Sequence, residues 1–149
     1  MAQKPKGLED LLRQLSIIEF KVAPEDVIIY AGSGNFPDDD REQWTDACNL
    51  LALREGVVIG YDRNTVTNQE FRNAYQNHYQ KQSKNLPAGM ATGFEVVSAT
   101  ELLHRFKAGE TTPATVKDTL IQLSSDELSR ARGGSRCMSQ PLLRDPLPF

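Results

Sequence analysis

The sequence has few of the residues that usually build metal sites. Its 149 residues include two cysteines and two histidines. They stand far apart, at Cys48, His78, His104 and Cys137, without the paired short spacings typical of a zinc site. We therefore expect a reduced chain that needs no metal or other cofactor.

The chain also lacks long apolar runs and an excess of positive charge. No run is long enough to cross a bilayer, and no apolar signal segment stands at the N-terminus. The net charge of −3 combines 17 basic with 20 acidic side chains, so no global field attracts a polyanion. These features predict a cytoplasmic protein that binds neither membranes nor nucleic acid. At this length we expect one domain with a real core, burying roughly two thirds of the unfolded surface.

In the first third of the chain, hydrophobic periodicity predicts one helix and two strands. Four leucines recur at the spacing of one helical face, which predicts a helix over residues 7–15. The alternating segment 17–22 and the β-branched run 27–30 predict strands, the second of them buried. Residues 35–46 follow neither period, so we expect a long loop that holds Trp44, the only tryptophan.

From residue 50 onward the spacing of apolar residues predicts a mixed α/β structure. Two apolar runs, 50–53 and 57–61, flank Gly56 and predict a β-hairpin. A helix is expected over 68–82, with a capping box of Thr67 and Glu70, and a linker over 83–93. A strand over 94–97 is then followed by a helix that begins at Ser98 and ends at Gly109. The last expected strands cover 119–123 and 138–143. The loose recurrence of strand, hairpin and helix suggests repeated units.

A basic, glycine-rich segment near the C-terminus places one thiol among three cations. Arg130, Arg132 and Arg136 all lie within seven residues of Cys137. A thiol attacks as a thiolate, which neighbouring guanidinium groups stabilise, so this pattern predicts a nucleophilic cysteine. The alternative is a flexible basic turn in which Cys137 is a small buried core residue. The spacing alone leaves both interpretations open.

Other candidate sites are weaker. His78 falls on the apolar stripe of the predicted helix 68–82, and His104 borders the apolar side of the next helix, so neither is assigned a catalytic role. The aspartates at 38–40 lack the alternating ligands of a calcium loop, and we expect a solvated acidic loop. A single Arg-Gly-Gly element without interleaved aromatic residues is a weak signal for RNA binding.

Three motifs, in this order along the chain, resemble the arginine deiminases. They are Arg41-Glu42-Gln43-Trp44-Thr45-Asp46, Tyr61-Asp62-Arg63-Asn64, and Glu127-Leu128 through Arg132-Gly133-Gly134 to Cys137-Met138. The likeness covers nearly the whole chain and includes the tail 141–146. It implies the guanidino-group modifying superfamily, whose fold is a five-bladed α/β propeller of ββαβ modules. Residues 1–149 would form a single partial domain, about two blades from the C-terminal portion.

The resemblance also implies a reaction. Cys137 would attack the guanidinium carbon of L-arginine, ammonia would leave, and water would hydrolyse the covalent intermediate to L-citrulline, with no metal or organic cofactor. The resemblance places Arg132 near the substrate, where its guanidinium would pair with the amino-acid carboxylate.

The chain departs from the family pattern in three places. The family's His-x-Asp element has no counterpart in this chain, because Gln80 and Phe106 stand two positions after the histidines. Ala47-Cys48-Asn49 stands where the family usually shows glycine and asparagine after Trp-x-Asp. Arg136 precedes the nucleophile at a position that sometimes holds histidine.

We therefore expect a chain that carries the nucleophile but not the histidine and carboxylates of the reaction, and that is inactive by itself. Its expected partners are a guanidino compound such as L-arginine and either the missing N-terminal part of the same enzyme or further copies of itself. Two blades would expose apolar faces and strand edges, which predicts oligomerisation. The alternative is a non-catalytic subunit or a module that binds guanidino ligands.

Overall fold

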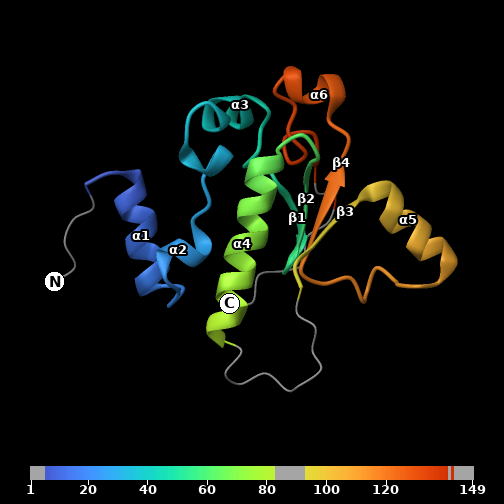
Figure 1. Ribbon diagram of the computed structural model, residues 1–149, viewed down its shortest axis with the longest axis horizontal. Helices are drawn as coiled ribbons and strands as arrows, with labels where there is room; N and C mark the ends of the chain where they lie inside the picture. The colour runs from blue at the N-terminus through green and yellow to red at the C-terminus, as the bar shows by residue number, and fades with distance from the viewer. Residues whose placement is uncertain (1–5, 83–92, 141, 143–149) are drawn as a thin grey trace.

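A computed structural model of the chain describes residues 6–82, 93–140 and 142. The described part is a mixed α/β structure with one four-stranded sheet (Figure 1). Its elements in chain order are α1 (Leu8–Ile18), α2 (Pro24–Val27), the 3-10 helix η1 (Ala31–Gly34), α3 (Asp38–Trp44), β1 (Leu51–Arg54), β2 (Val57–Tyr61), α4 (Thr65–Gln82), β3 (Glu95–Ser98), α5 (Ala99–Ala108), β4 (Thr119–Leu123) and α6 (Asp126–Arg130). The predicted α/β class is confirmed.

The sheet has the strand order β1-β2-β4-β3. β1 and β2 form the predicted antiparallel hairpin, in which Gly56 takes the positive φ of 71° that the turn requires. β4 lies between β2 and β3 and is parallel to both. Parallel neighbours need crossover connections, and α4 and α5 supply them. All four described strands therefore belong to one sheet.

The core lies between α5 and one face of the sheet. Ile59, Ile121 and Val97 stand side by side across β2, β4 and β3. Leu102 of α5, which is buried, packs against this face. In Figure 1, α4 lies between the sheet and the N-terminal helices α1 and α2.

Several elements after residue 50 begin and end where the sequence predicts. The strand 119–123 is confirmed as β4, and α5 begins at the predicted cap, where the Ser98 hydroxyl accepts the Glu101 N–H. Gly109 ends α5 in the left-handed region at φ 72°. The helix predicted over 68–82 begins earlier, at Thr65. Thr67 is therefore inside α4 rather than its cap, and its hydroxyl bonds to a distant carboxylate.

Both strands predicted before residue 31 are wrong. The helical spacing of the leucines continues to Ile18, so α1 extends into the segment expected to be a strand. Pro24 occupies the first turn of α2, with acidic residues beside it, and these N-terminal signals favour a helix over the β-branched run. Val27 is exposed rather than buried.

The long loop predicted over residues 35–46 contains a helix. Asp38, Asp39 and Asp40 form the first turn of α3, where carboxylates interact favourably with the helix dipole. Arg41 pairs with Asp38 along the helix surface. The strand predicted over 138–143 is also wrong where residues are described, since 138–140 and 142 contain none. Most of the predicted linker, residues 83–92, lies outside the described part.

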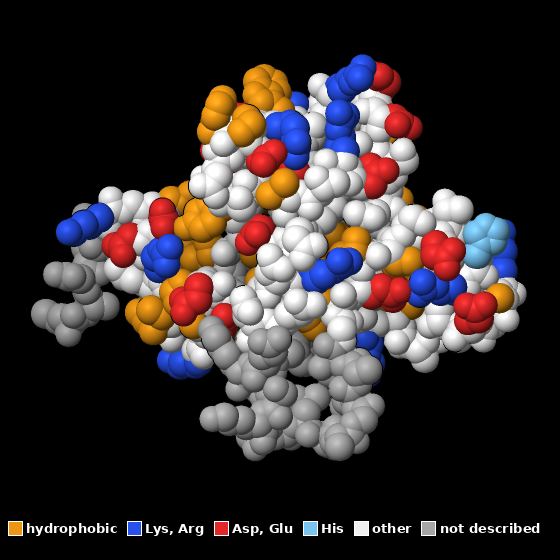
Figure 2. All heavy atoms as spheres, viewed as in Figure 1, with side chains coloured by type: hydrophobic (Ala, Val, Ile, Leu, Met, Phe, Trp, Pro, Cys, Tyr) orange, Lys and Arg blue, Asp and Glu red, His pale blue; other side chains and the backbone are white. Residues whose placement is uncertain are grey.

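Apolar side chains remain exposed at the N-terminal end of the molecule. They gather over α1 and α2 on the left of Figure 2. The large exposed ones in this region are Leu8, Leu11, Leu12, Leu15, Ile17, Ile18, Phe20, Val27 and Tyr30. None of the described helices is long and apolar enough to cross a membrane.

Candidate active site

The second and third sequence motifs meet where β2 ends. The Tyr61 hydroxyl donates to the carbonyl oxygen of Gly133. Arg63 donates through Nη1 to the hydroxyl of Ser129, at 3.0 Å, and Ser129 is fully buried at the end of α6. These contacts hold the loop that follows α6 against the end of β2.

Tyr61 remains a hydrogen-bond donor in this position. Burial of the phenol raises the pKa of Tyr61, and electrostatic interactions with Asp46 and with Cys137 raise it further. The neutral hydroxyl is the form that can donate to Gly133, so the charge environment supports the contact.

The first motif joins the second through a buried amide. Asn64 is almost fully buried, and its side chain donates to the carbonyl oxygen of Thr45 at 3.1 Å and accepts from the Thr45 hydroxyl. The segment after α3 is thereby fixed to the turn between β2 and α4. Because Tyr61 and Arg63 flank the same turn, all three motifs converge on it.

A buried carboxylate ties α3 to the start of α4. Glu42 is fully buried and accepts the backbone N–H groups of Val66 and Thr67 at 2.9 and 2.7 Å, together with the Thr67 hydroxyl at 2.7 Å. Burial opposes the ionisation of Glu42, but the bonds from Thr67, Val66 and Arg41 outweigh it and hold the pKa of Glu42 below its ordinary value. The N–H groups at the first turn of α4 thus have a charged acceptor.

Cys137 is exposed, and its sulfur has a hydrogen-bond donor. The side-chain amide of Asn49 donates through Nδ2 to Sγ at 2.7 Å. Ser135, which is buried, lies with its hydroxyl oxygen 2.9 Å from the carbonyl oxygen of Asn49 and 3.0 Å from that of Ile59. Cys137 is therefore not a small core residue, and the alternative of a buried thiol is wrong.

A hollow of about 450 Å³ opens at the sulfur. Cys48, Asn49, Arg136 and Cys137 line it. Arg136 thus brings a cation to the hollow that the Cys137 thiol borders. Such a combination of an accessible sulfur and a positive charge suits a thiolate.

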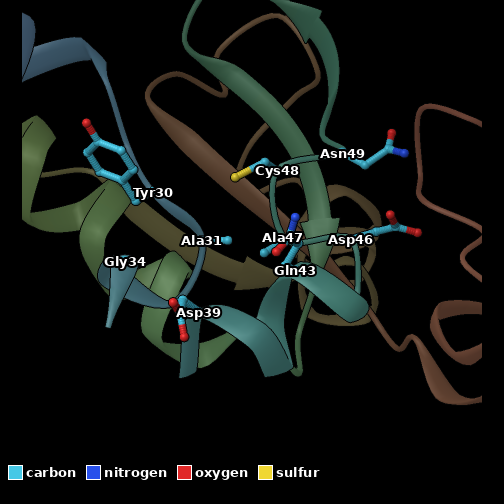
Figure 3. A pocket seen from close by; sticks show the side chains of 9 residues that line it. All are labelled: Tyr30, Ala31, Gly34, Asp39, Gln43, Asp46, Ala47, Cys48 and Asn49. Atoms are coloured by element: carbon cyan, nitrogen blue, oxygen red, sulfur yellow. The ribbon is translucent and has the colours of Figure 1, made fainter. Parts of the chain in front are cut away.

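A second hollow, of about 460 Å³, is shown in Figure 3, and Cys48 and Asn49 are among the residues that line it. In Figure 3 the Cys48 sulfur points away from the side to which the Asn49 amide points. Desolvation raises the pKa of the Cys48 thiol, against the opposing effect of a bond from the Ala31 N–H, and the Glu42 carboxylate adds to the rise. Cys48 is therefore held in its neutral thiol form.

Arg132 stacks on Trp44. Its guanidinium carbon lies 3.8 Å from the centroid of the indole ring. Arg132 is in the left-handed region at φ 57°, which turns the chain between α6 and Gly133. This contact is the link between the first and third motifs, and it shows that Trp44 supports the loop that carries the predicted site.

Comparison with known proteins matches a stretch of the chain that contains all three motifs. A family model described as arginine deiminase covers residues 8–144. The chain belongs to the arginine deiminase family. It is 34% identical over 123 residues to an arginine deiminase of Staphylococcus epidermidis, and 34% identical over 124 residues to that of Latilactobacillus sakei. Each match covers 83% of this chain but 20% of the relative, so the chain spans about a fifth of the length of these curated relatives.

The predicted residues of the arginine deiminase site lie in one loop but have different neighbours. Cys137 contacts Asn49, whereas Arg132 contacts Trp44. His104 is exposed on α5 and does not line the hollow at the sulfur. His78 lies in α4, and its side chain is outside the described part. Among residues 6–82, 93–140 and 142, no cluster of three or more acidic, histidine or cysteine side chains is placed to hold a metal ion.

Glu42 lies in the first motif and Asn49 three residues after it, but the sequence indicates no role for either. Asn49 was visible as the residue after an unusual Ala47-Cys48 pair, but nothing in the spacing showed that it reaches a residue 88 positions away. Glu42 stood in a segment expected to be a loop. Its burial depends on α3, which the sequence analysis did not predict.

Proposed function

We propose that Cys137 is the nucleophile of an arginine deiminase reaction. The thiolate forms a C–S bond to the guanidinium carbon of L-arginine, and the C–N bond to a terminal nitrogen breaks as that nitrogen takes a proton and leaves as ammonia. Water then forms a C–O bond to the same carbon. The C–S bond breaks, the electron pair returns to sulfur, and L-citrulline is released. The two steps consume one water and need no redox partner.

The observation that carries this proposal is the setting of the Cys137 sulfur. It is exposed, it receives an N–H hydrogen bond at 2.7 Å, and it borders a hollow that Arg136 also lines. A thiolate needs accessibility and nearby positive charge or donors to act as a nucleophile at neutral pH. Family membership supports guanidino compounds as the substrate class.

We assign Arg132 to the carboxylate of the amino-acid substrate. The contact with the Trp44 ring holds the Arg132 guanidinium in place by one of its faces. A stacked guanidinium keeps its N–H groups at the edge, where a carboxylate accepts two parallel hydrogen bonds. Arg132 would thus anchor one end of the substrate while Cys137 attacks the other.

The proposal requires residues that the described part of the chain does not supply at the hollow. Proton transfer to the leaving nitrogen needs a histidine or another acid, and a guanidinium needs carboxylates to hold it. The residues that line the hollow are two cysteines, an asparagine and an arginine. We propose that the described sheet and its helices form the C-terminal portion of a propeller of ββαβ blades in a cytoplasmic enzyme, and that other blades provide the missing groups.

A complementation assay tests the proposal. Citrulline formation from L-arginine is measured for this chain, for the remaining N-terminal part of an arginine deiminase, and for the two together. We expect citrulline only from the mixture. Cys137→Ala should abolish it, while Ser124→Ala, at an exposed serine without a role in the site, should not. Turnover by the isolated chain or by the Cys137→Ala mixture would contradict the assignment.

A second candidate is a module that binds guanidino compounds without reacting. No histidine is among the described residues that line the hollow, which favours this function. Calorimetric titration with L-arginine separates the two functions. A binding module would bind L-arginine equally well after Cys137→Ala and would form no citrulline in any mixture.

A further inference from the structure

Asn49 is fastened to the loop of Cys137 at three points. Its amide Nδ2 lies 2.7 Å from Sγ of Cys137, and its carbonyl oxygen lies 2.9 Å from the hydroxyl oxygen of Ser135. Its side chain also packs so closely on Gly134 that a Cβ placed there would lie 2.4 Å from Cγ of Asn49. The backbone N–H of Asn49 bonds to the carbonyl oxygen of Asp46 at 3.0 Å, which fixes the main chain at Asn49.

The direction of this hydrogen bond matters for the chemistry of sulfur. A neutral thiol can either donate to the oxygen of an amide or accept from its nitrogen, whereas a thiolate can only accept. The Asn49 amide presents its nitrogen, so the contact is stronger when Cys137 is ionised. The bond also fixes the direction in which the remaining lone pairs of sulfur point.

We propose that Asn49 is a catalytic residue that holds the Cys137 thiolate. This assignment rests on the proposed nucleophilic role of Cys137. Before attack, the amide N–H donates to the sulfur and aims it into the hollow lined by Arg136. During hydrolysis of the intermediate, the same N–H stabilises the negative charge that returns to sulfur as the C–S bond breaks.

Alkylation of Cys137 tests this role without any substrate. The rate of carboxamidomethylation by iodoacetamide is followed from pH 5.5 to 9.5, with Cys137 and Cys48 resolved by peptide mass spectrometry. Asn49→Ala removes one hydrogen-bond donor to the charged sulfur. It should slow alkylation of Cys137 at pH 7 by roughly five- to tenfold and raise the pH at which the rate is half-maximal. Asn49→Asp places a carboxylate beside the sulfur and should raise that pH further.

The alanine variant separates a chemical role from a structural one. A carboxylate at position 49 repels a thiolate whatever the role of the amide, so Asn49→Asp serves to show that the fold tolerates a change of this side chain: packing on Gly134 is preserved and the thermal melt should change little. If Asn49 only holds the loop, Asn49→Ala will keep the parent chain's pH of half-maximal rate even where its rate falls, and the proposal is overturned. Asn35→Ala removes an exposed amide that bonds only within its own turn and should leave the profile unchanged.

The outcome of the alkylation experiment is independent of the outcome of the citrulline assay. A profile that does not shift removes Asn49 from the site but leaves Cys137→Ala to decide the proposed function. A shifted profile together with no citrulline in any mixture assigns Asn49 to the thiolate of a site that binds without turnover.

Discussion

The guanidinium of Arg132 lies 3.8 Å above the ring of Trp44. The two residues are 88 positions apart in the chain, one at the end of α3 and the other in the loop that leads to Cys137. Trp44 is 61% exposed even with this contact, so its burial in a core does not explain its place. The ring instead supplies a platform for the cation that we assign to the substrate carboxylate. As the only tryptophan, it also reports on that loop.

Arg132→Ala should alter the fluorescence of Trp44. Loss of the guanidinium uncovers one face of the ring, so the emission maximum should move to longer wavelength. The free energy of unfolding should fall by about 0.5–1 kcal/mol, the usual size of an exposed cation–π contact. Steady-state emission and urea denaturation measure both. Arg130→Ala is the matched control, because Arg130 pairs with Glu127 at 2.9 Å and should leave the emission of Trp44 unchanged.

Glu42→Gln should destabilise the protein strongly at neutral pH. The N–H groups of Val66 and Thr67 each donate to a different oxygen of Glu42, so the NH₂ group of the variant faces one of these donors. We expect a loss of about 2–3 kcal/mol, since a buried hydrogen-bonded charge is removed and donors are left unpaired. Glu55→Gln, at an exposed turn, should change the free energy of unfolding by less than about 0.5 kcal/mol.

The contribution of Glu42 should also depend on pH. Its pKa is lower in the folded chain than the ordinary value of 4.5, so the unfolded chain takes up the proton first as the pH falls. The stability that Glu42 provides is complete above pH 4.5 and is lost as the pH falls through its lower folded value. Urea denaturation of the parent and of Glu42→Gln at pH 7, 5, 4 and 3 should give curves that converge toward acid. A constant difference across this range would contradict the assignment.

Gly134→Ala tests how tightly the loop of Cys137 fits against Asn49. A Cβ at this position would lie 2.4 to 2.7 Å from three atoms of the Asn49 side chain, so one of the two segments has to shift. We expect a loss of about 1–3 kcal/mol in the free energy of unfolding and slower alkylation of Cys137. Gly93→Ala meets nothing within 4 Å and should change neither measurement.

The elements after residue 50 follow from local signals that agree with their tertiary setting. The hairpin of β1 and β2 has a glycine where the turn needs positive φ, and α5 has both a side-chain cap and a terminal glycine. Before residue 50 the local signals conflict. The β-branched run 27–30 has strand propensity, yet it follows Pro24 and two acidic residues that favour a helical turn, and it pairs with none of the four strands of the described sheet.

Part of the site was predictable because it also depends on local sequence signals. Cys137 and Arg132 share one segment, so their charge pattern is visible in the sequence. The contacts of Asn49 with Cys137 and of Tyr61 with Gly133 join residues 88 and 72 positions apart. Such contacts depend on how β2 and the turn after α3 come together. The resemblance to a family identified the motifs that meet, but the contact partner of each side chain could be assigned only from the fold.

The exposed apolar face of α1 should drive association of the isolated chain. Leu8 and Leu12 are 73% and 43% exposed, and they belong to a larger group of exposed apolar residues over α1 and α2 (Figure 2). Surfaces of this kind are usually covered by another chain or domain. We expect size-exclusion chromatography with light scattering to show a mass that rises with protein concentration.

Two substitutions on this face should remove the association. Leu8→Gln with Leu12→Gln keeps side chains compatible with a helix while replacing exposed apolar surface. The measured mass should then stay near the monomer value of 16.6 kDa across the same concentration series. Leu103→Gln is the matched control, because Leu103 is 55% exposed on α5, away from the N-terminal group, and should leave the concentration dependence intact. A parent chain that stays monomeric throughout would show that α1 needs no partner.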